Sequence, residues 1–83
     1  METRTFVEGF HTFWCGVEEE KAGVFACDVT FVTNSFNGPP RIMRFKLNGF
    51  FARAEVALGV SERYGRNMIR RHGDVVAYLA AKE

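Results

Sequence analysis

The sequence lacks several features that would assign it to a class at once. It has no apolar run approaching the roughly 18 residues of a membrane-spanning helix, and its first residues do not show the basic-then-apolar order of a secretion signal. Only two of its 83 residues are proline and two are cysteine, which excludes a collagen-like repeat and a disulfide scaffold. We therefore expect a cytoplasmic protein with no membrane contact, in which Cys15 and Cys27 are reduced thiols.

The sequence also lacks the short motifs of common enzyme classes. There is no GxSxG, HExxH, phosphate-binding P-loop or GxGxxG sequence. Cys15 and His11 could form a nucleophile and base, but both fall on the apolar face of an expected strand, where a packed thiol is the ordinary outcome. His11, His72 and the two thiols do not have the spacing of zinc ligands. We predict no enzyme, no metal site and no cofactor.

What the sequence does have is the composition of an ordinary globular domain. Hydrophobic residues make up 47% and charged residues 25%, and nine residues are Phe. Each buried aromatic side chain removes roughly 150–250 Å² from water, so a short chain can still build a dense core. We expect one domain spanning residues 1–83.

The charges are divided unevenly along the chain. Residues 1–40 hold six acids and two bases, a net charge of −4, whereas residues 41–83 hold nine bases and four acids, a net charge of +5. The two halves meet at Gly38-Pro39-Pro40, which predicts a loop within one domain. Such asymmetry points to charged partners.

Alternating apolar residues predict three strands in the first half. Phe13, Cys15 and Val17 share one face of the first strand, and the odd-numbered residues 25–31 share the same face of the second. A loop over residues 19–23 gives paired residue numbers a sum of about 42, which sets Cys15 opposite Cys27. A third strand over residues 42–47 pairs with the second at a sum of about 74.

The second half predicts two helices that cover this apolar face. The first has Asn48 as its N-cap and ends at Gly59, and Ser61 caps the second. His72-Gly73-Asp74 breaks or kinks the second helix. The residues expected on its inward stripe are Tyr64, Met68, Val75 and Leu79. The predicted fold class is α+β: a three-stranded antiparallel β-meander over residues 1–48, followed by two α-helices over residues 49–83 packed on one face of the sheet.

The opposite face of the sheet is expected to stay open. The predicted register places Trp14 beside Asp28 and Lys46, Thr12 beside Thr30 and Arg44, and Phe10 beside Val32 and Ile42. One hypothesis is a platform for a partner protein, a second subunit or stacked bases; the alternative is an ordinary ladder in which Trp14 packs over Lys46. The candidate partner-binding residues are Trp14, Phe10, Arg44, Lys46, Glu18, Glu19 and Glu20.

Two charged groups add to these candidates. Glu18, Glu19 and Glu20 are expected at a hairpin tip, where three carboxylates either mimic phosphates toward a basic partner or keep the loop soluble. Arginines at helical spacing in the second helix suit phosphate or carboxylate recognition, or form a solvated face. The residues proposed to contact a nucleic acid or an acidic partner are Arg63, Arg66, Asn67, Arg70 and Arg71.

Residues Ala57 to Arg63 (Ala-Leu-Gly-Val-Ser-Glu-Arg), followed by Met68-Ile69-Arg70-Arg71, resemble the turn and recognition helix of helix-turn-helix regulators. The resemblance implies that Leu-Gly-Val-Ser forms the turn and that the residues after it enter the major groove. Gly65 stands where that pattern has a β-branched core residue. The strand over residues 41–47 followed by helices is also similar to ribbon-helix-helix repressors.

Two hypotheses for function follow. The first is a small non-enzymatic inhibitor or adaptor that docks on a larger, nucleic-acid-handling protein; in size and architecture it resembles the counter-defence proteins of phages and mobile elements, anti-CRISPR proteins among them. The alternative is a DNA-binding transcriptional regulator that uses residues 58–71 and forms a homodimer through the open sheet face. We rank the first higher because half of the chain is spent on a sheet with an exposed Trp.

Overall fold

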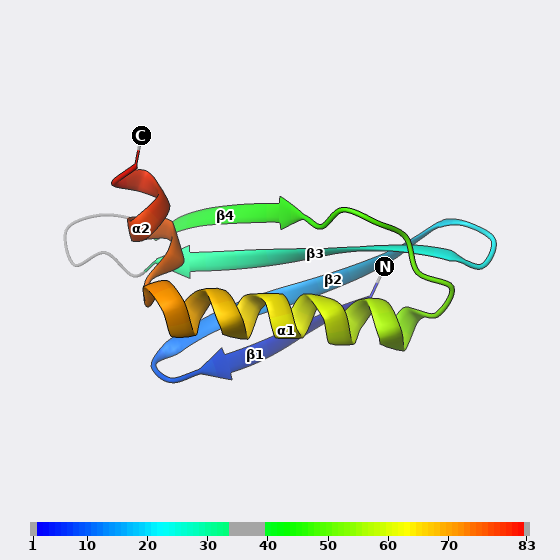
Figure 1. The fold of residues 1–83 in the computed structure, drawn as a ribbon, viewed down its shortest axis with the longest axis horizontal. Helices are drawn as coiled ribbons and strands as arrows, with labels where there is room; N and C mark the ends of the chain where they lie inside the picture. Colours follow the sequence, from blue (N-terminus) through cyan, green and yellow to red (C-terminus); the bar gives the residue numbers. More distant parts are fainter. Residues whose placement is uncertain (1, 34–39, 83) are drawn as a thin grey trace.

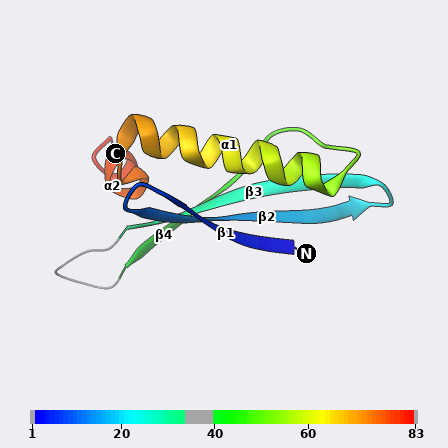
Figure 2. The ribbon, with the colours of Figure 1, turned by 90° about the horizontal axis from the view of Figure 1, so that it is seen from below.

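The chain forms a four-stranded antiparallel sheet with two helices on one of its faces (Figures 1 and 2). This computed structural model describes residues 2–33 and 40–82. The strands lie side by side in chain order, and the molecule measures 44 × 21 × 20 Å. The elements are β1 (Glu2–Glu8), β2 (His11–Lys21), β3 (Val24–Thr33), β4 (Arg41–Lys46), α1 (Ala54–His72) and α2 (Val75–Ala80). The α+β class is confirmed, and the number of strands is wrong because β1 was not predicted.

Strand β1 shows no apolar alternation, because three of the four residues on its core-facing side are charged. Phe6 is the one large apolar side chain that β1 places against the core, where its ring stacks on Phe13 with centroids 5.5 Å apart. A two-residue turn at Gly9-Phe10 joins β1 to β2, and Gly9 has a φ of 62°. A glycine at the first central position of a two-residue hairpin turn is the available signal for this strand.

The pairing of β2 with β3 is shifted by two residues from the prediction. Phe13 pairs with Phe31, Cys15 with Val29, and Val17 with Cys27, so the two cysteines are not opposite each other. The turn lies at Ala22-Gly23, and a bulge between Glu19 and Lys21 adds one residue to β2. A shift of two keeps every side chain on its predicted face, because side chains alternate with a period of two.

The pairing of β3 with β4 is as predicted. Phe31 pairs with Met43 and Val29 pairs with Phe45, which gives the expected sum of 74. Beyond the end of β4, the backbone N–H of Leu47 donates to the carbonyl of Cys27 at 3.0 Å. Of the loop predicted at Gly38-Pro39-Pro40, Gly38 and Pro39 lie outside the described residues.

Helix α1 is one continuous helix where two were predicted on either side of Gly59. It begins at Ala54 rather than after Asn48, because Phe51 pairs with Phe25 through two backbone hydrogen bonds of 2.8 and 2.9 Å. Gly59 lies on the exposed side of the helix, and Ser61 is fully buried with its hydroxyl donating to the carbonyl of Leu58. The cost of about 1 kcal/mol for a helical glycine is outweighed by the burial of the helix face.

The core lies between α1 and the middle strands. Phe13, Cys15 and Val29 are fully buried. The fully packed side of α1 is next to the predicted one, so that Tyr64 and Met68 are only half-buried at its border. The buried residues of α1 are Ala57, Leu58, Ser61, Gly65 and Ile69. Gly65 explains how closely the helix approaches the sheet, since a Cβ there would lie 2.6 Å from Cδ2 of Phe13. The glycine that departs from the helix-turn-helix pattern is therefore a packing residue.

The predicted break at His72-Gly73-Asp74 is confirmed. Gly73 has a φ of 66° and its N–H donates to the carbonyl of Ile69, which ends α1. Asp74 then caps α2, accepting a hydrogen bond from the N–H of Ala77 at 2.9 Å and another from the hydroxyl of Thr33. Val75 and Val76 are buried, so α2 covers the end of β3 that α1 does not reach.

Both helices lie on one side of the sheet and leave its other side open. Figure 2 shows α1 and α2 as one layer above the strands, and no described helix lies below the sheet. Within residues 2–33 and 40–82, no helix is both long enough and apolar enough to cross a bilayer.

Candidate functional site

The outer face of the sheet, which is the face turned away from α1 and α2, carries the first set of candidate residues. Trp14 lies near the middle of this face, half-buried, with Thr5 of β1 and Thr30 of β3 as its neighbours on either side. Thr30 in turn pairs with Arg44 of β4. A continuous row from Thr5 through Trp14 to Arg44 therefore crosses all four strands.

One end of the outer face is apolar. Val7 of β1 and Ile42 of β4 are 59% and 65% exposed, and Ile42 pairs with the half-buried Val32. Phe10 lies in the adjacent β1–β2 turn and is completely exposed, so it does not sit in a strand beside Val32 and Ile42 as predicted. The apolar corner that the sequence indicated is present, but β1 supplies Val7 to it.

The other end of the outer face is held by ion pairs, and here the predicted ladder is wrong. The residue of β2 that pairs with Asp28 is Gly16, not Trp14. A Cβ on Gly16 would lie 2.7 Å from the Asp28 carboxylate. Arg44 donates from Nε to that carboxylate at 2.9 Å. Lys46 donates to Glu20 at 3.1 Å instead of packing under Trp14.

The three consecutive glutamates do not form an acidic tip. They lie within β2, and alternation separates them. Glu19 accepts a hydrogen bond from the N–H of Gly23 at 3.1 Å and closes the turn, while Glu20 pairs with Lys46. The side chain of Glu18 is exposed and forms no hydrogen bond with any residue in the described ranges. A phosphate-like cluster of three carboxylates is therefore not built.

The predicted arginine group on α1 divides into a structural part and an exposed part. Arg66 is structural: its guanidinium donates to Glu62 at 2.8 Å, to Glu8 at 3.0 Å and to the carbonyl of Val7 at 2.8 Å. It also lies over the ring of Phe6, 5.6 Å from the centroid. Its hydrogen bonds to the carboxylates of Glu62 and Glu8 raise the pKa of Arg66. This side chain ties α1 to the end of β1.

Glu8 is the carboxylate that joins the two elements. Arg70 donates to it at 3.1 Å from the next turn of α1, beside Arg66. The hydrogen bonds from Arg70 and then Arg66 lower the pKa of Glu8 below its ordinary value of 4.5. Arg70 remains 62% exposed, so this contact leaves much of its guanidinium facing solvent.

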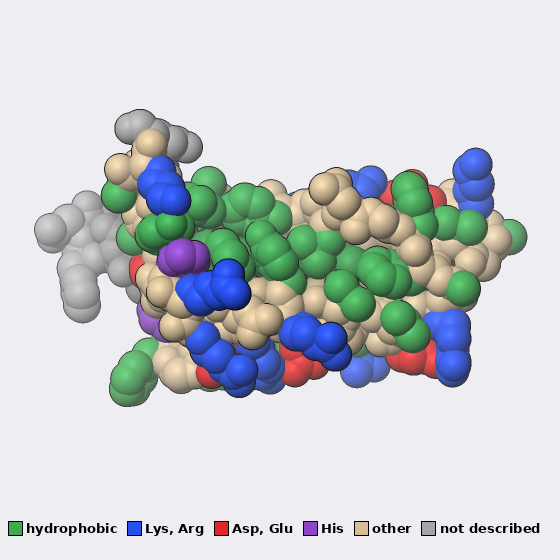
Figure 3. All heavy atoms as spheres, in the orientation of Figure 1, with side chains coloured by type: hydrophobic (Ala, Val, Ile, Leu, Met, Phe, Trp, Pro, Cys, Tyr) green, Lys and Arg blue, Asp and Glu red, His purple; other side chains and the backbone are tan. Residues whose placement is uncertain are grey.

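Arg63, Asn67 and Arg71 form the exposed part, one helical turn apart on the side of α1 away from the sheet. None of the ion pairs within the described residues involves Arg63 or Arg71. Figure 3 shows basic side chains gathered over the C-terminal half of α1. We call Arg63, Asn67, Arg70 and Arg71 the arginine ridge.

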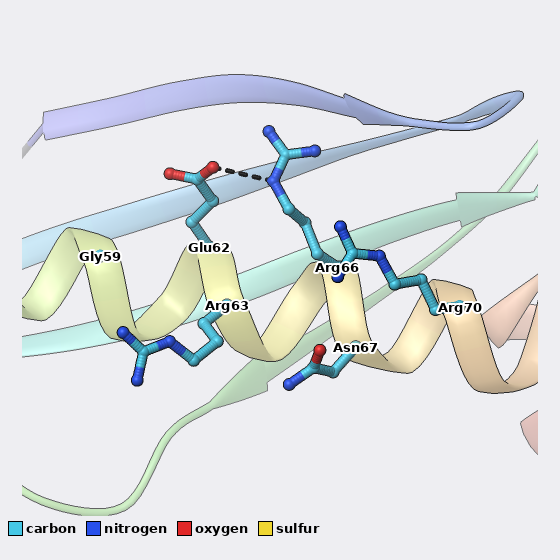
Figure 4. Close-up of a pocket in the computed structure, with 6 residues that line it drawn as sticks. All are labelled: Gly59, Glu62, Arg63, Arg66, Asn67 and Arg70. Carbon is cyan, nitrogen blue, oxygen red and sulfur yellow. Dashed lines mark hydrogen bonds and ion pairs between the residues drawn. The ribbon is translucent and has the colours of Figure 1, made fainter.

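A shallow depression of about 300 Å³ lies along this ridge, from Gly59 to Arg70 (Figure 4). Gly59 leaves room for it, because nothing lies within 4 Å of where its side chain would be. Figure 4 shows Glu62 turned toward Arg66, with Arg63 and Asn67 pointing to the other side of the helix. The lining residues are Gly59, Glu62, Arg63, Arg66, Asn67 and Arg70.

The helix-turn-helix interpretation of residues 58–71 is wrong. All of them lie inside α1, and Leu58 and Ser61, the residues of the expected turn, are buried against the sheet. A two-helix unit that presents its second helix to the major groove is therefore absent from this segment.

The two thiols are core residues. Cys15 and Cys27 are both buried and free, and burial raises the pKa of each. Among residues 2–33 and 40–82, no three His, Cys, Asp or Glu side chains are grouped closely enough to hold a metal ion.

Sequence reasoning missed the contribution of β1 to the outer face. Thr5 and Val7 extend that face by one strand, and the turn glycine Gly9 was the available signal for it. Comparison with protein-family models, curated proteins and solved structures gave no match for this chain.

Proposed function

We propose that this chain is a non-enzymatic binding protein, an inhibitor or adaptor, that docks on a larger nucleic-acid-handling protein through the outer face of its sheet. One observation carries the proposal: all described helices lie on one side of the four-stranded sheet, which leaves its other side open. That open side presents Trp14, flanked by Thr5 and Thr30, and it also has an exposed apolar end. Large apolar side chains exposed on an uncovered sheet face are typical of interaction surfaces.

The composition of the outer face suits a protein partner. Val7 and Ile42 are each more than half exposed, as is Phe10 in the adjacent β1–β2 turn, and Trp14 is of a residue type enriched at binding hot spots. Along β4, Arg44 and Lys46 remain 59% and 65% exposed even though each has an internal partner. The matching surface has an apolar centre that receives Trp14 and an acidic rim facing β4. The nucleic-acid-handling role of the partner rests on the analogy of size and architecture with counter-defence proteins.

Replacement of Trp14 by Ala tests this proposal. Loss of a hot-spot Trp costs about 2 kcal/mol or more of binding free energy, which is about a thirtyfold loss of affinity. Because Trp14 lies outside the core, the free energy of unfolding should change by only about 1 kcal/mol. Wild-type, Trp14→Ala and Phe50→Ala chains serve as baits in cells that express the protein. A protein captured by the wild type is then purified, and its Kd is measured for each of the three chains.

Phe50→Ala is the matched control, since Phe50 is an aromatic residue 66% exposed outside the sheet. The proposal requires a purified partner that the wild type and Phe50→Ala bind equally and Trp14→Ala binds at least tenfold more weakly. Equal binding by all three chains contradicts it. A homodimer that Trp14→Ala converts to a monomer also contradicts it, because the occupant of the face is then a second copy.

A further inference from the structure

The arginine ridge is not used by the outer-face interaction, and it lies on the opposite side of the molecule. We propose that the ridge binds the phosphodiester backbone of duplex DNA, without a helix-turn-helix. Arg63, Asn67, Arg70 and Arg71 all belong to the C-terminal half of one continuous helix, and all four are exposed.

The first argument is the distribution of charge on α1. The acids near the ridge are half-buried and paired: Glu62 pairs with Arg66, and Glu8 pairs with Arg66 and Arg70. Arg66 uses its guanidinium on these partners and on the Val7 carbonyl, so it is excluded from the ridge. The solvent-facing charge that remains is positive and comes from Arg63, Arg70 and Arg71.

The second argument is shape. Helix α1 forms its own layer above the sheet, and no described element lies over it (Figure 2). Arg63 and Arg71 are eight residues apart, which is about 12 Å along a helix axis. Duplex DNA carries one negative charge per about 1.7 Å of its axis, and its major groove, about 12 Å wide, admits a single α-helix. Three arginines on a projecting helix can therefore reach several phosphates together, and the amide of Asn67 can donate between them.

The third argument favours DNA over an acidic protein as the ligand of the arginine ridge. A protein interface has an apolar core inside a polar rim, whereas a DNA interface is more polar and much more basic. None of the large apolar side chains that are exposed in the described residues lies between Arg63 and Arg71. The exposed apolar residues of α1, Val56 and Val60, precede the ridge. Arginine also matches phosphate geometry with two parallel donors.

The test is a salt titration of binding to a 20-base-pair duplex of mixed sequence, followed by fluorescence anisotropy. Three phosphate contacts give a slope of log K against log salt of about −2.7. The variant Arg63→Ala/Arg71→Ala should leave a slope of about −0.9 and weaken binding at low salt by about tenfold or more. Its melting temperature should equal that of the wild type, because both side chains are exposed.

The matched control is Arg4→Ala/Arg53→Ala, which removes the same charge at two other exposed positions, 60% and 71% exposed. It should keep the wild-type slope. If it lowers the slope as much as the ridge variant does, net charge and not the ridge attracts DNA, and the proposal fails. It also fails if the wild type shows no binding at low salt, or if a 20-residue polyglutamate peptide binds more tightly than the duplex, which makes the occupant an acidic protein.

Discussion

At the scale of single residues, two glycines of α1 show how differently one residue type can act. Gly65 lies where the helix touches Phe13, and Gly59 lies on the exposed side with nothing within 4 Å of its missing side chain. Gly65→Ala forces a methyl group into the Phe13 ring and should destabilise the fold by about 1–3 kcal/mol. Gly59→Ala should stabilise it by up to about 1 kcal/mol, through helix propensity alone.

Urea denaturation of the two variants beside the wild type measures both effects. The pair has opposite expected signs in one helix, so it also tests whether α1 is continuous. If Gly59 were a helix stop with positive φ, an alanine there would destabilise the protein instead.

The residue scale also shows what sequence patterns could and could not supply. The inward faces of β2 and β3 were predicted correctly, because period-two alternation survives a shift of two residues. The partner of Trp14 was not, because the turn lies at Ala22-Gly23, later than the predicted centre of the loop over residues 19–23. Paired residue numbers sum to 45 at that turn and to 44 beyond the bulge between Glu19 and Lys21, instead of the predicted 42. Trp14 was therefore placed on the correct face but beside the wrong residues. A bulge has no composition signal that distinguishes it from the turn next to it.

At the scale of elements, α1 is held to β1 by the carboxylate of Glu8. Because its hydrogen bonds with Arg70 and Arg66 lower the pKa of Glu8 in the folded state, this group stabilises the fold above its ordinary value of 4.5. That contribution is lost as the pH falls through the lower, folded-state pKa. Acidification should therefore loosen the contact between the end of β1 and α1.

Glu8→Gln tests this pH dependence. The variant should be less stable than the wild type at pH 7, and the two should converge as the pH falls below the lowered pKa of Glu8. The measurement is the urea midpoint at several pH values. Glu18→Gln is the control, since the side chain of Glu18 is exposed and forms no hydrogen bond within residues 2–33 and 40–82. A wild type and Glu8→Gln that differ by a constant amount at every pH would show that the ion pairs contribute nothing to stability.

The element scale also separates what was predictable in the second half of the chain. The break at Gly73 was predicted because a glycine followed by a capping Asp has a local signature. The supposed stop at Gly59 has the same residue type, but its burial context decides the outcome: Leu58 and Ser61 on either side pack on the sheet. Strand β1 was missed for the related reason that Glu8, at its end, pairs with Arg66 and Arg70 of α1, a contact between residues about sixty positions apart. Long-range pairing is not visible in a local pattern.

At the scale of the whole molecule, the two proposed surfaces lie on opposite sides of a sheet with one helix layer (Figure 2). Trp14 points away from α1, while Arg63 and Arg71 point away from the sheet, and the core of Phe13, Cys15 and Val29 lies between them. The two surfaces share no side chain among the described residues. They should therefore act independently.

This independence gives the last prediction. Trp14→Ala should weaken partner binding and leave duplex binding unchanged, and Arg63→Ala/Arg71→Ala should do the reverse. Sites without shared partners usually add to within about 0.3–0.5 kcal/mol, so the unfolding free energy of the triple variant should equal the sum of the separate changes to that tolerance. The partner's Kd, measured with and without saturating 20-base-pair duplex, should be the same. If the duplex displaces the partner, both bind one surface, and the division of the molecule into a protein-binding sheet face and a DNA-binding helix face is wrong.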